Sequence, residues 1–303
     1  MIEITGLSKR FGTKLAVDDV SFTVPPGQVT GFLGPNGAGK STTMRMIIGL
    51  DRPTAGTALV DGKPYAAHHD PLRRVGALLE AKAVHTGRSA RNHLRALAAT
   101  HGIPNRRVDE VIEMTGLESV AGKRVKGFSL GMGQRLGIAA ALLGDPQTLI
   151  LDEPVNGLDP EGVAWVRQLA RYQAGQGRTV FISSHLMSEM ALTADHIIVL
   201  GRGRVLADSP IGDLLARAQG GSVTVRTPDP GGFATAIGGL GASIATNPDG
   251  SLTVSGTTAA QIGDAASHAG VVLHELTSVS ASLEETFLEL TAGDVEYRSE
   301  AAK

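Results

Sequence analysis

A glycine-rich segment near the N-terminus constrains the fold more than any other part of this 303-residue sequence. Residues Gly34 to Thr42 read GPNGAGKST, which matches the pattern GxxxxGK(S/T). The segment follows an apolar run, Gln28 to Leu33, and precedes a helical pattern, Lys40 to Ile48. A strand, a glycine-rich turn and a helix in this order indicate a phosphate-binding loop, because the backbone N–H groups of the turn and of the helix N-terminus point toward a bound anion.

The loop predicts a nucleoside triphosphate as the ligand. Lys40 is expected to reach the β- and γ-phosphate oxygens, and Ser41 to place a hydroxyl on Mg²⁺. The residues expected to bind the nucleotide are Gly34, Pro35, Asn36, Gly37, Ala38, Gly39, Lys40, Ser41 and Thr42.

A second apolar run ends in two acids. Thr148 to Leu151 is followed by Asp152 and Glu153, which places both carboxylates at the carboxyl edge of a parallel sheet, beside the phosphate loop. Asp152 can then hold Mg²⁺ through its hydration shell, and Glu153 can accept a proton from an attacking water. The alternative, two solvated acids at a strand end, is less favoured once a phosphate loop precedes them.

Composition excludes several other classes of protein. The chain contains 0 Cys, which rules out a disulfide scaffold, a thiolate metal site and a cysteine nucleophile. Its formal net charge is −2, so we expect no nucleic-acid partner. Neither a signal peptide nor an apolar run of membrane-spanning length is visible, and we expect a soluble, cytoplasmic protein.

Residues 1–220 read as one α/β domain. Short strands with turn chemistry fill the first sixty residues, and a helical subdomain is expected at about 83–145. Helical periodicity there runs through Ala90 to Ala99, Arg106 to Met114 and Gln134 to Leu143. Three runs that are apolar on both faces favour a central parallel sheet: Thr148 to Leu151, Thr179 to Ile182 and Ile197 to Leu200.

The composition shifts near Gly220-Gly221, and residues 221–303 are predicted to form a small α+β accessory domain. Its expected order is β-α-β-β-α-β plus a helix, the split βαβ arrangement. The predicted strands are Ser222 to Arg226, Ala242 to Thr246, Ser251 to Ser255 and Val271 to Glu275, and the predicted helices are Phe233 to Gly239, Ala259 to His268 and Leu283 to Thr291.

Further motifs follow the two described above in a fixed order. Phe128 to Met132 (FSLGM), directly followed by Gly133-Gln134-Arg135, stands at the position of the LSGGQ motif of one family. Gly157-Leu158-Asp159-Pro160 and Ser183-Ser184-His185 come after Asp152 and Glu153. Over residues 1–220 the chain resembles the ATPase subunit of ABC transporters. The resemblance implies a P-loop core with a mostly parallel sheet, an antiparallel β subdomain and a helical subdomain, and it implies ATP and Mg²⁺ as cofactors.

The resemblance also assigns roles to single residues. It implies that Phe11 stacks on adenine and that Glu153 and His185 are catalytic. Ser129 and Gly131 would close the ATP site of a second copy, in a homodimer with ATP at the interface, and Asp159 would couple the two sites. The residues implied at the metal are Ser41, Glu80 and Asp152.

Three positions depart from the family pattern. Leu130 and Met132 replace Gly and Gln in the signature, and Glu80 replaces Gln in the Q-loop. A carboxylate at 80 can still reach Mg²⁺ through water, but it cannot donate a hydrogen bond as an amide can. Together the departures resemble a branch of bacterial drug- and antibiotic-resistance exporters.

The resemblance therefore implies the ATP-binding and ATP-hydrolysing subunit of an exporter of drugs, antibiotics or other hydrophobic compounds. Such a subunit would lie on the inner face of the cell membrane, bound to a separate integral-membrane permease. An importer ATPase would share every catalytic motif and stays open. A soluble ABC-type ATPase acting on nucleic acid or ribosomes is the other alternative, although only 89 residues without sustained heptads separate Lys40 from Ser129.

Overall fold

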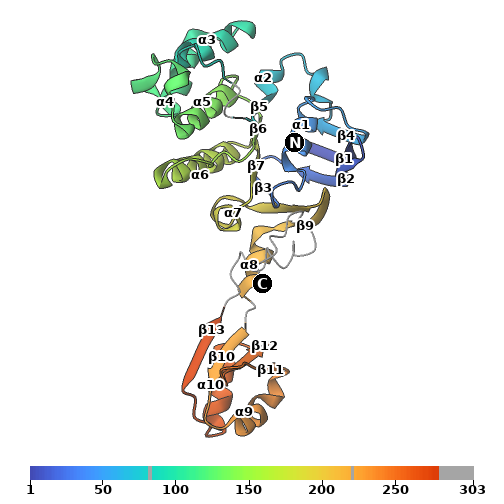
Figure 1. The fold of residues 1–303 in the computed structure, drawn as a ribbon, viewed down its shortest axis with the longest axis vertical. Coiled ribbons are helices and arrows are strands. Elements are labelled where there is room, and N and C mark those ends of the chain that lie inside the picture. Colours follow the sequence, from blue (N-terminus) through green and yellow to red (C-terminus); the bar gives the residue numbers. More distant parts are fainter. Residues whose placement is uncertain (81–83, 220–221, 280–303) are drawn as a thin grey trace. The chain divides into compact units, whose positions relative to one another are not determined.

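The computed structural model describes residues 1–80, 84–219 and 222–279, and Figure 1 shows their elements. The chain divides into two compact units, of which the first comprises Met1–Ile211 and the second begins at Gly212. No helix within the described residues is long and apolar enough to cross a lipid bilayer.

A six-stranded sheet forms the centre of the first unit, in the order β5-β6-β7-β3-β8-β9. Every neighbouring pair is parallel except β8 and β9, which confirms the predicted mostly parallel sheet. The strands β3, β6 and β7 are buried along their whole length, as runs covered on both faces should be. The bounds are β3 (Val29–Leu33), β5 (Val75–Leu78), β6 (Thr148–Leu151), β7 (Thr179–Ser184), β8 (His196–Gly201) and β9 (Arg204–Pro210).

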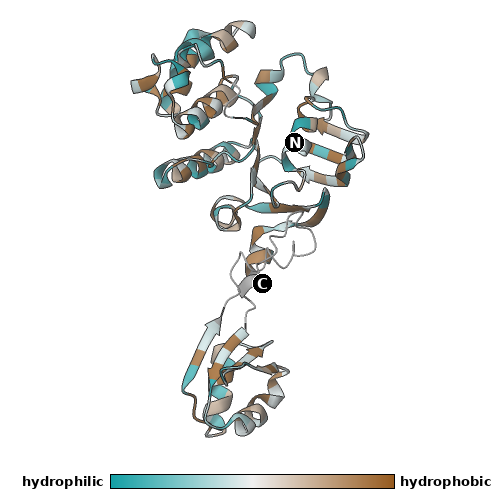
Figure 2. Cartoon of the chain, in the orientation of Figure 1, coloured by the Kyte–Doolittle hydropathy of each residue, from teal (hydrophilic) through white to brown (hydrophobic). Residues whose placement is uncertain are grey.

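An antiparallel sheet of three strands covers one side of this central sheet together with α1 (Lys40–Ile47), as Figure 1 shows. Its strands are β2 (Lys14–Val24), β1 (Ile2–Phe11) and β4 (Ala55–Val60), in that order. Buried residues alternate with exposed ones along the second half of β2, and Figure 2 shows hydrophobic residues alternating with hydrophilic ones in this sheet. Phe22, Phe32 and Phe181 join the layers, with ring centroids 5.0–5.7 Å apart.

The helical region contains α3 (Ala90–Thr100), α4 (Asn105–Met114) and α5 (Leu130–Leu142), and the short helix α2 (Pro71–Arg74) directly precedes β5. The helix α5 packs directly on β5, because a Cβ at Gly76 would lie 1.9 Å from the carbonyl oxygen of Ala141. Periodicity predicted this helix from Gln134, but it begins at Leu130, since the Ser129 hydroxyl accepts the N–H of Met132 and caps it there. The remaining helices are α6 (Pro160–Gly175), α7 (Met187–Thr193) and α8 (Ile211–Gln219).

The second unit contains a four-stranded antiparallel sheet in the order β11-β12-β10-β13, the helices α9 and α10, and α8 from Gly212 onward. The order of elements along the chain, β-α-β-β-α-β, is the predicted split βαβ arrangement. Its core contains Val223, Val225, Phe233, Ile237, Leu252, Val254 and Ile262. The bounds are β10 (Ser222–Arg226), α9 (Pro230–Ile237), β11 (Ser243–Thr246), β12 (Leu252–Ser255), α10 (Ala259–His268) and β13 (Glu275–Val279).

The last strand of this unit was predicted at the wrong residues. Val271 and Leu273 pack against the core without belonging to a strand, and pairing with β10 runs instead from Glu275 to Val279. The apolar run Val271 to Leu273 is thus explained by core packing after the end of α10. The predicted helix Leu283 to Thr291 lies outside the described residues.

Candidate active site

The phosphate loop connects β3 to α1, as predicted, and glycine is required at both of its ends. A Cβ at Gly34 would lie 2.3 Å from the carbonyl oxygen of Leu200. Gly39 has φ +105°, and a Cβ there would lie 2.6 Å from the carbonyl oxygen of Ala16. The backbone therefore passes against β2 and β8 without room for a side chain, which fixes the loop at the carboxyl edge of the sheet.

Lys40 lies inside this loop with a side chain only 6% exposed. Its ammonium donates to the carbonyl oxygens of Gly34 at 2.6 Å and Pro35 at 3.4 Å. The same Nζ lies 3.4 Å from Oε1 of Glu153. A buried ammonium needs such acceptors, and these three hold it at the place where phosphate oxygens are expected.

Asp152 and Glu153 follow β6 and are tied to β7 by one hydroxyl. Ser183 Oγ donates to Asp152 Oδ1 and accepts the backbone N–H of Glu153 at 2.9 Å. Glu153 has φ +48°, in the left-handed region that costs a residue with a side chain about 1–2 kcal/mol. Strain of this kind persists only where neighbours enforce it, and it is typical of functional positions.

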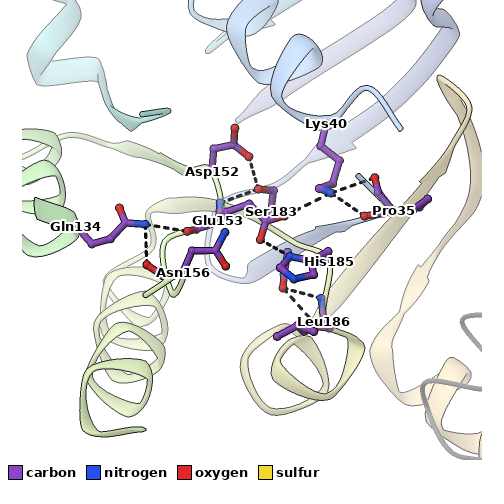
Figure 3. A network of polar contacts seen from close by, with 11 residues as sticks. Pro35, Lys40, Gln134, Asp152, Glu153, Asn156, Ser183, His185 and Leu186 are labelled. Atoms are coloured by element: carbon purple, nitrogen blue, oxygen red, sulfur yellow. Dashed lines mark hydrogen bonds and ion pairs between the residues drawn. The ribbon is translucent and has the colours of Figure 1, made fainter. Parts of the chain in front are cut away.

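The carboxylate of Glu153 lies between two partners, as Figure 3 shows. Its Oε2 is 2.8 Å from Nδ1 of His185, and its Oε1 faces Lys40. An ionised carboxylate only accepts hydrogen bonds, so Nδ1 of His185 carries the proton in this contact. Oε1 is buried and has no hydrogen-bond donor among the described residues. The site thus contains a carboxylate oxygen that is able to accept a proton.

Phe11 lines the pocket formed by the phosphate loop, together with Lys14 and Glu153. Its ring is 49% exposed, and the Lys9 ammonium lies 4.8 Å from the ring centroid. Because this ring is exposed and lines the pocket, Phe11 is not a core residue. The complete lining is Phe11, Lys14, Ala16, Pro35 to Thr42 and Glu153.

Ser129, Gly131 and Asp159 do not line this pocket. Ser129 and Asp159 instead cap helices, Ser129 at α5 and Asp159 at α6. Leu130, which departs from the family signature, is half-exposed and packs against Gly157. A Cβ at Gly157 would lie 2.2 Å from Leu130 Cδ2. The signature segment and the segment around Gly157 are therefore in contact within one chain.

The residues expected at the metal supply oxygen ligands. Asp152 is 9% exposed, and its N–H donates to the carbonyl oxygen of Leu78 at 2.7 Å, two residues before Glu80. Ser41 is exposed in the first turn of α1. Among the described residues no group of three or more His, Asp or Glu side chains is arranged to hold a metal ion. One hydroxyl and two carboxylates match the oxygen preference of Mg²⁺, which usually keeps several waters and takes few protein ligands.

Two residues of this site were not predicted. Ser183 was noted only as part of the segment before His185, and Gln134 only as part of the sequence after the signature. Gln134 donates its amide to the carbonyl oxygens of Glu153 at 3.0 Å and Asn156 at 3.4 Å. The one available signal for Ser183 was its position at the end of the apolar strand β7, beside the end of β6. The spacing of residues in the sequence gives no such signal for Gln134.

A strand, a glycine loop closed around a buried lysine, and a neighbouring strand that ends in two acids define a P-loop nucleotide-binding protein. The profile of the ABC transporter family matches residues 17–156, and that of a domain of unknown function (DUF8746) matches residues 221–284. The chain belongs to the ATP-binding subunits of ABC transporters, and it is an ATP-hydrolysing transport ATPase.

Relatives and solved structures agree with this assignment. The bacitracin transport ATP-binding protein BcrA of Bacillus licheniformis is 42% identical over 220 residues, 72% of each chain. The lantibiotic transport ATP-binding protein SrtF of Streptococcus pyogenes is 35% identical over 208 residues, 69% of this chain and 90% of its own. A solved ATP-binding subunit of an ABC transporter has a TM-score of 0.65 at 28% identity and covers 72% of this chain and 92% of its own.

Proposed function

We propose that this chain powers the export of an antibiotic or another hydrophobic compound through a separate membrane permease. The observation that carries the proposal is the position of the Glu153 carboxylate, 2.8 Å from His185 Nδ1 and 3.4 Å from Lys40 Nζ at the edge of the phosphate loop. Transport of bacitracin and of a lantibiotic by the systems of two relatives supports the substrate class.

ATP binding would use residues already gathered at the pocket. Lys40 would exchange its two carbonyl acceptors for the β- and γ-phosphate oxygens, and the loop N–H groups from Gly34 to Thr42 would surround the phosphates. Phe11 would stack on the adenine. Ser41, Asp152 and, through water, Glu80 would hold Mg²⁺, which neutralises charge on the phosphates when bound.

Hydrolysis would use the pair formed by Glu153 and His185. Glu153 Oε1 would accept the proton of the attacking water, because it belongs to a carboxylate that lines the phosphate-loop pocket and it accepts no hydrogen bond from the described residues, with the Lys40 ammonium 3.4 Å away as its ion-pair partner. The contact from Nδ1 to Oε2 would orient the His185 ring, leaving Nε2 to contact the γ-phosphate and the water.

The signature would act on a second copy of the chain. Ser129 and Gly131 lie at the N-terminus of α5 and do not line this chain's own pocket. A head-to-tail homodimer would bring them to the γ-phosphate bound by the partner, and Asp159 would couple the two sites. We further propose that residues 1–220 form the ATPase domain, with its helical subdomain at about 83–145, that residues 221–303 form an accessory domain, and that the complex lies on the cytoplasmic face of the membrane.

Replacing the base tests the proposal. Glu153→Gln is expected to keep ATP binding and to lower turnover by roughly 10²–10⁴, the usual contribution of a positioned general base. The variant should also accumulate an ATP-bound dimer, visible by size-exclusion chromatography. Lys40→Ala, measured by nucleotide titration, should instead abolish ATP binding.

Glu118→Gln is the matched control, because Glu118 is exposed in a short 3₁₀ turn (Glu118–Val120) of the helical region. Its turnover and its ATP affinity should equal those of the wild type. Normal hydrolysis by Glu153→Gln would show that Glu153 is not the base and would overturn the proposed mechanism.

A further inference from the structure

Gln134 connects the signature helix to the residue proposed as the base. It lies in the second turn of α5, and its side chain is 5% exposed. Its Nε2 donates to the carbonyl oxygen of Glu153 at 3.0 Å and to that of Asn156 at 3.4 Å (Figure 3). The contact joins α5 to the segment that follows β6, and its two residues are 19 positions apart in the sequence.

The amide is held there at a cost, because Gln134 Oε1 is buried with no hydrogen-bond partner among the described residues. A buried polar atom without a partner is unfavourable. A residue kept only for core packing would be expected to lack such an atom. The hydrogen bonds of Nε2 are therefore the feature that needs an explanation.

The carbonyl that Gln134 contacts belongs to a strained residue. Glu153 has φ +48° and is followed by Pro154, which disfavours helical backbone at the preceding position. Its N–H is held by Ser183 Oγ at 2.9 Å, and its carbonyl accepts both Gln134 Nε2 and the N–H of Asn156 at 3.2 Å. The backbone that aims the carboxylate is thus fixed by β7 on one side and by α5 on the other.

We propose that Gln134 is a positioning residue that transmits the state of the signature to Glu153. The inference rests on the proposed dimer, in which the N-terminus of α5 contacts the ATP bound by the partner. Ser129 and Gln134 belong to the same helix, so a displacement of its N-terminus by that ATP would shift the Glu153 carbonyl and the carboxylate it orients. Gln134 would then couple occupancy of one ATP site to hydrolysis at the other.

Gln134→Met tests the coupling, because methionine keeps the length and the apolar body of the side chain but has no N–H donor. The variant is expected to bind ATP within twofold of the wild-type affinity, measured by nucleotide titration. Its kcat should fall at least tenfold, and the Hill coefficient for ATP should fall toward 1. Unchanged ATP binding together with a lowered kcat indicates a positioning role. A general loss of structure would not produce this combination.

Gln173→Met is the matched control. Gln173 is 2% exposed on α6 and accepts a hydrogen bond from Arg178 at 2.8 Å. This variant should lose thermal stability while it keeps the wild-type kcat and Hill coefficient. If Gln134→Met fails to bind ATP, Gln134→Leu, which is smaller and likewise has no hydrogen-bond donor, is measured in the same way.

Each outcome decides the proposal. Wild-type kcat and Hill coefficient in Gln134→Met would overturn it, and so would a failure of both Gln134 variants to fold and bind ATP, because the role would then be structural. Glu153→Gln, measured in parallel, distinguishes failure of the proposed coupling from failure of the proposed base. An inactive Glu153→Gln beside a fully active Gln134→Met would refute the coupling alone, whereas an active Glu153→Gln would refute the proposed base.

Discussion

Two carboxyl groups lie in opposite electrostatic environments in this chain. Burial raises the pKa of Glu189 on α7, and the nearby Glu153 raises it further, while His185 and Arg167 partly oppose the shift. The Asp249 carboxyl, by contrast, has a pKa of about 2, because it accepts the hydroxyl and then the N–H of Ser251 and also pairs with Arg226. The first group disfavours its ionised form in the folded state, and the second favours it.

We expect Asp249→Asn to lower the stability of the second unit in a pH-dependent way. The folded pKa of about 2 lies below the usual value of 3.8, so the contribution of Asp249 is present above about pH 4 and is lost as the pH falls toward 2. The difference in unfolding midpoint between wild type and variant should therefore be largest near pH 6 and shrink toward pH 2.5. Hydrogen exchange at the amides of β10 and β12 reports on this unit, and a difference that stays constant with pH would contradict the prediction.

Single residues also show how far the sequence could predict the site. Lys40 lies at the start of α1 and Asp152 directly after β6, where the sequence predicted a helix start and a strand end, since each belongs to a short segment with its own strand or helix. The contact of Glu153 with His185, 32 residues away, and its left-handed backbone depend on the alignment of β6 with β7. Periodicity and composition contain no information on such an alignment at the level of single atoms.

At the scale of elements, the start of α5 is packed against the segment that leads into α6. Leu130 fills the space above Gly157, and Leu158 lies against Gly131. The larger side chain at position 130 is thus accommodated by a glycine across the contact, and Ser129 keeps its place as the cap of α5. The departure from the family signature changes the packing between two elements and leaves the helix start intact.

Gly157→Ala is expected to destabilise this contact by about 1–3 kcal/mol more than the backbone alone would explain, the usual cost of overpacking. Gly177→Ala is the matched control, since Gly177 has φ +77° beside +75° for Gly157 and has nothing within 4 Å of its Cβ position. The two variants are compared by thermal unfolding. Adding Leu130→Gly to Gly157→Ala should remove the extra loss of stability that Gly157→Ala shows relative to Gly177→Ala. Equal losses of stability in Gly157→Ala and Gly177→Ala would show that Leu130 does not clash with a side chain at position 157.

Two elements were misplaced by the sequence analysis because apolar periodicity does not show the contacts that fix their bounds. The start of α5 and the position of β13 depend on a cap at Ser129 and on core packing of Val271 and Leu273, respectively. Apolar periodicity identifies buried residues, but it does not distinguish a buried strand from a buried irregular segment. The helix α10, which has a capping box at Thr258, was predicted with its correct bounds, Ala259–His268.

At the scale of the whole molecule, we propose that the permease contacts the residues around Leu78 to Arg95, as the resemblance to the ABC family implies. Residues 81–83 of this range lie outside the described residues. Arg88 is exposed within the turn before α3, and its carbonyl accepts the N–H of Val125 at 2.9 Å. Arg91 instead forms an ion pair with Asp109 of α4. Arg88 is therefore the better position at which to probe a partner.

Arg88→Glu is expected to lower recovery of the co-purifying membrane partner at least tenfold, because its charge is reversed on an exposed surface. ATP hydrolysis by the isolated chain should stay within twofold of the wild type, since Arg88 does not line the nucleotide pocket. Arg171→Glu, an exposed arginine on α6, serves as the control and should change neither quantity. Unchanged recovery of the partner with Arg88→Glu would refute this location of the contact.

The contact between Leu130 and Gly157 also limits the order in which a lineage could have acquired this sequence. An ancestor with a side chain at position 157 would have accepted leucine at 130 only with strain, because a β-carbon at 157 and Leu130 Cδ2 would lie 2.2 Å apart in the present geometry. Substitution of glycine at 157 before leucine at 130 avoids this strain, and a descendant that regains alanine at 157 avoids it by first losing the leucine. The order of least strain through this pair of positions therefore substitutes the smaller residue first in either direction.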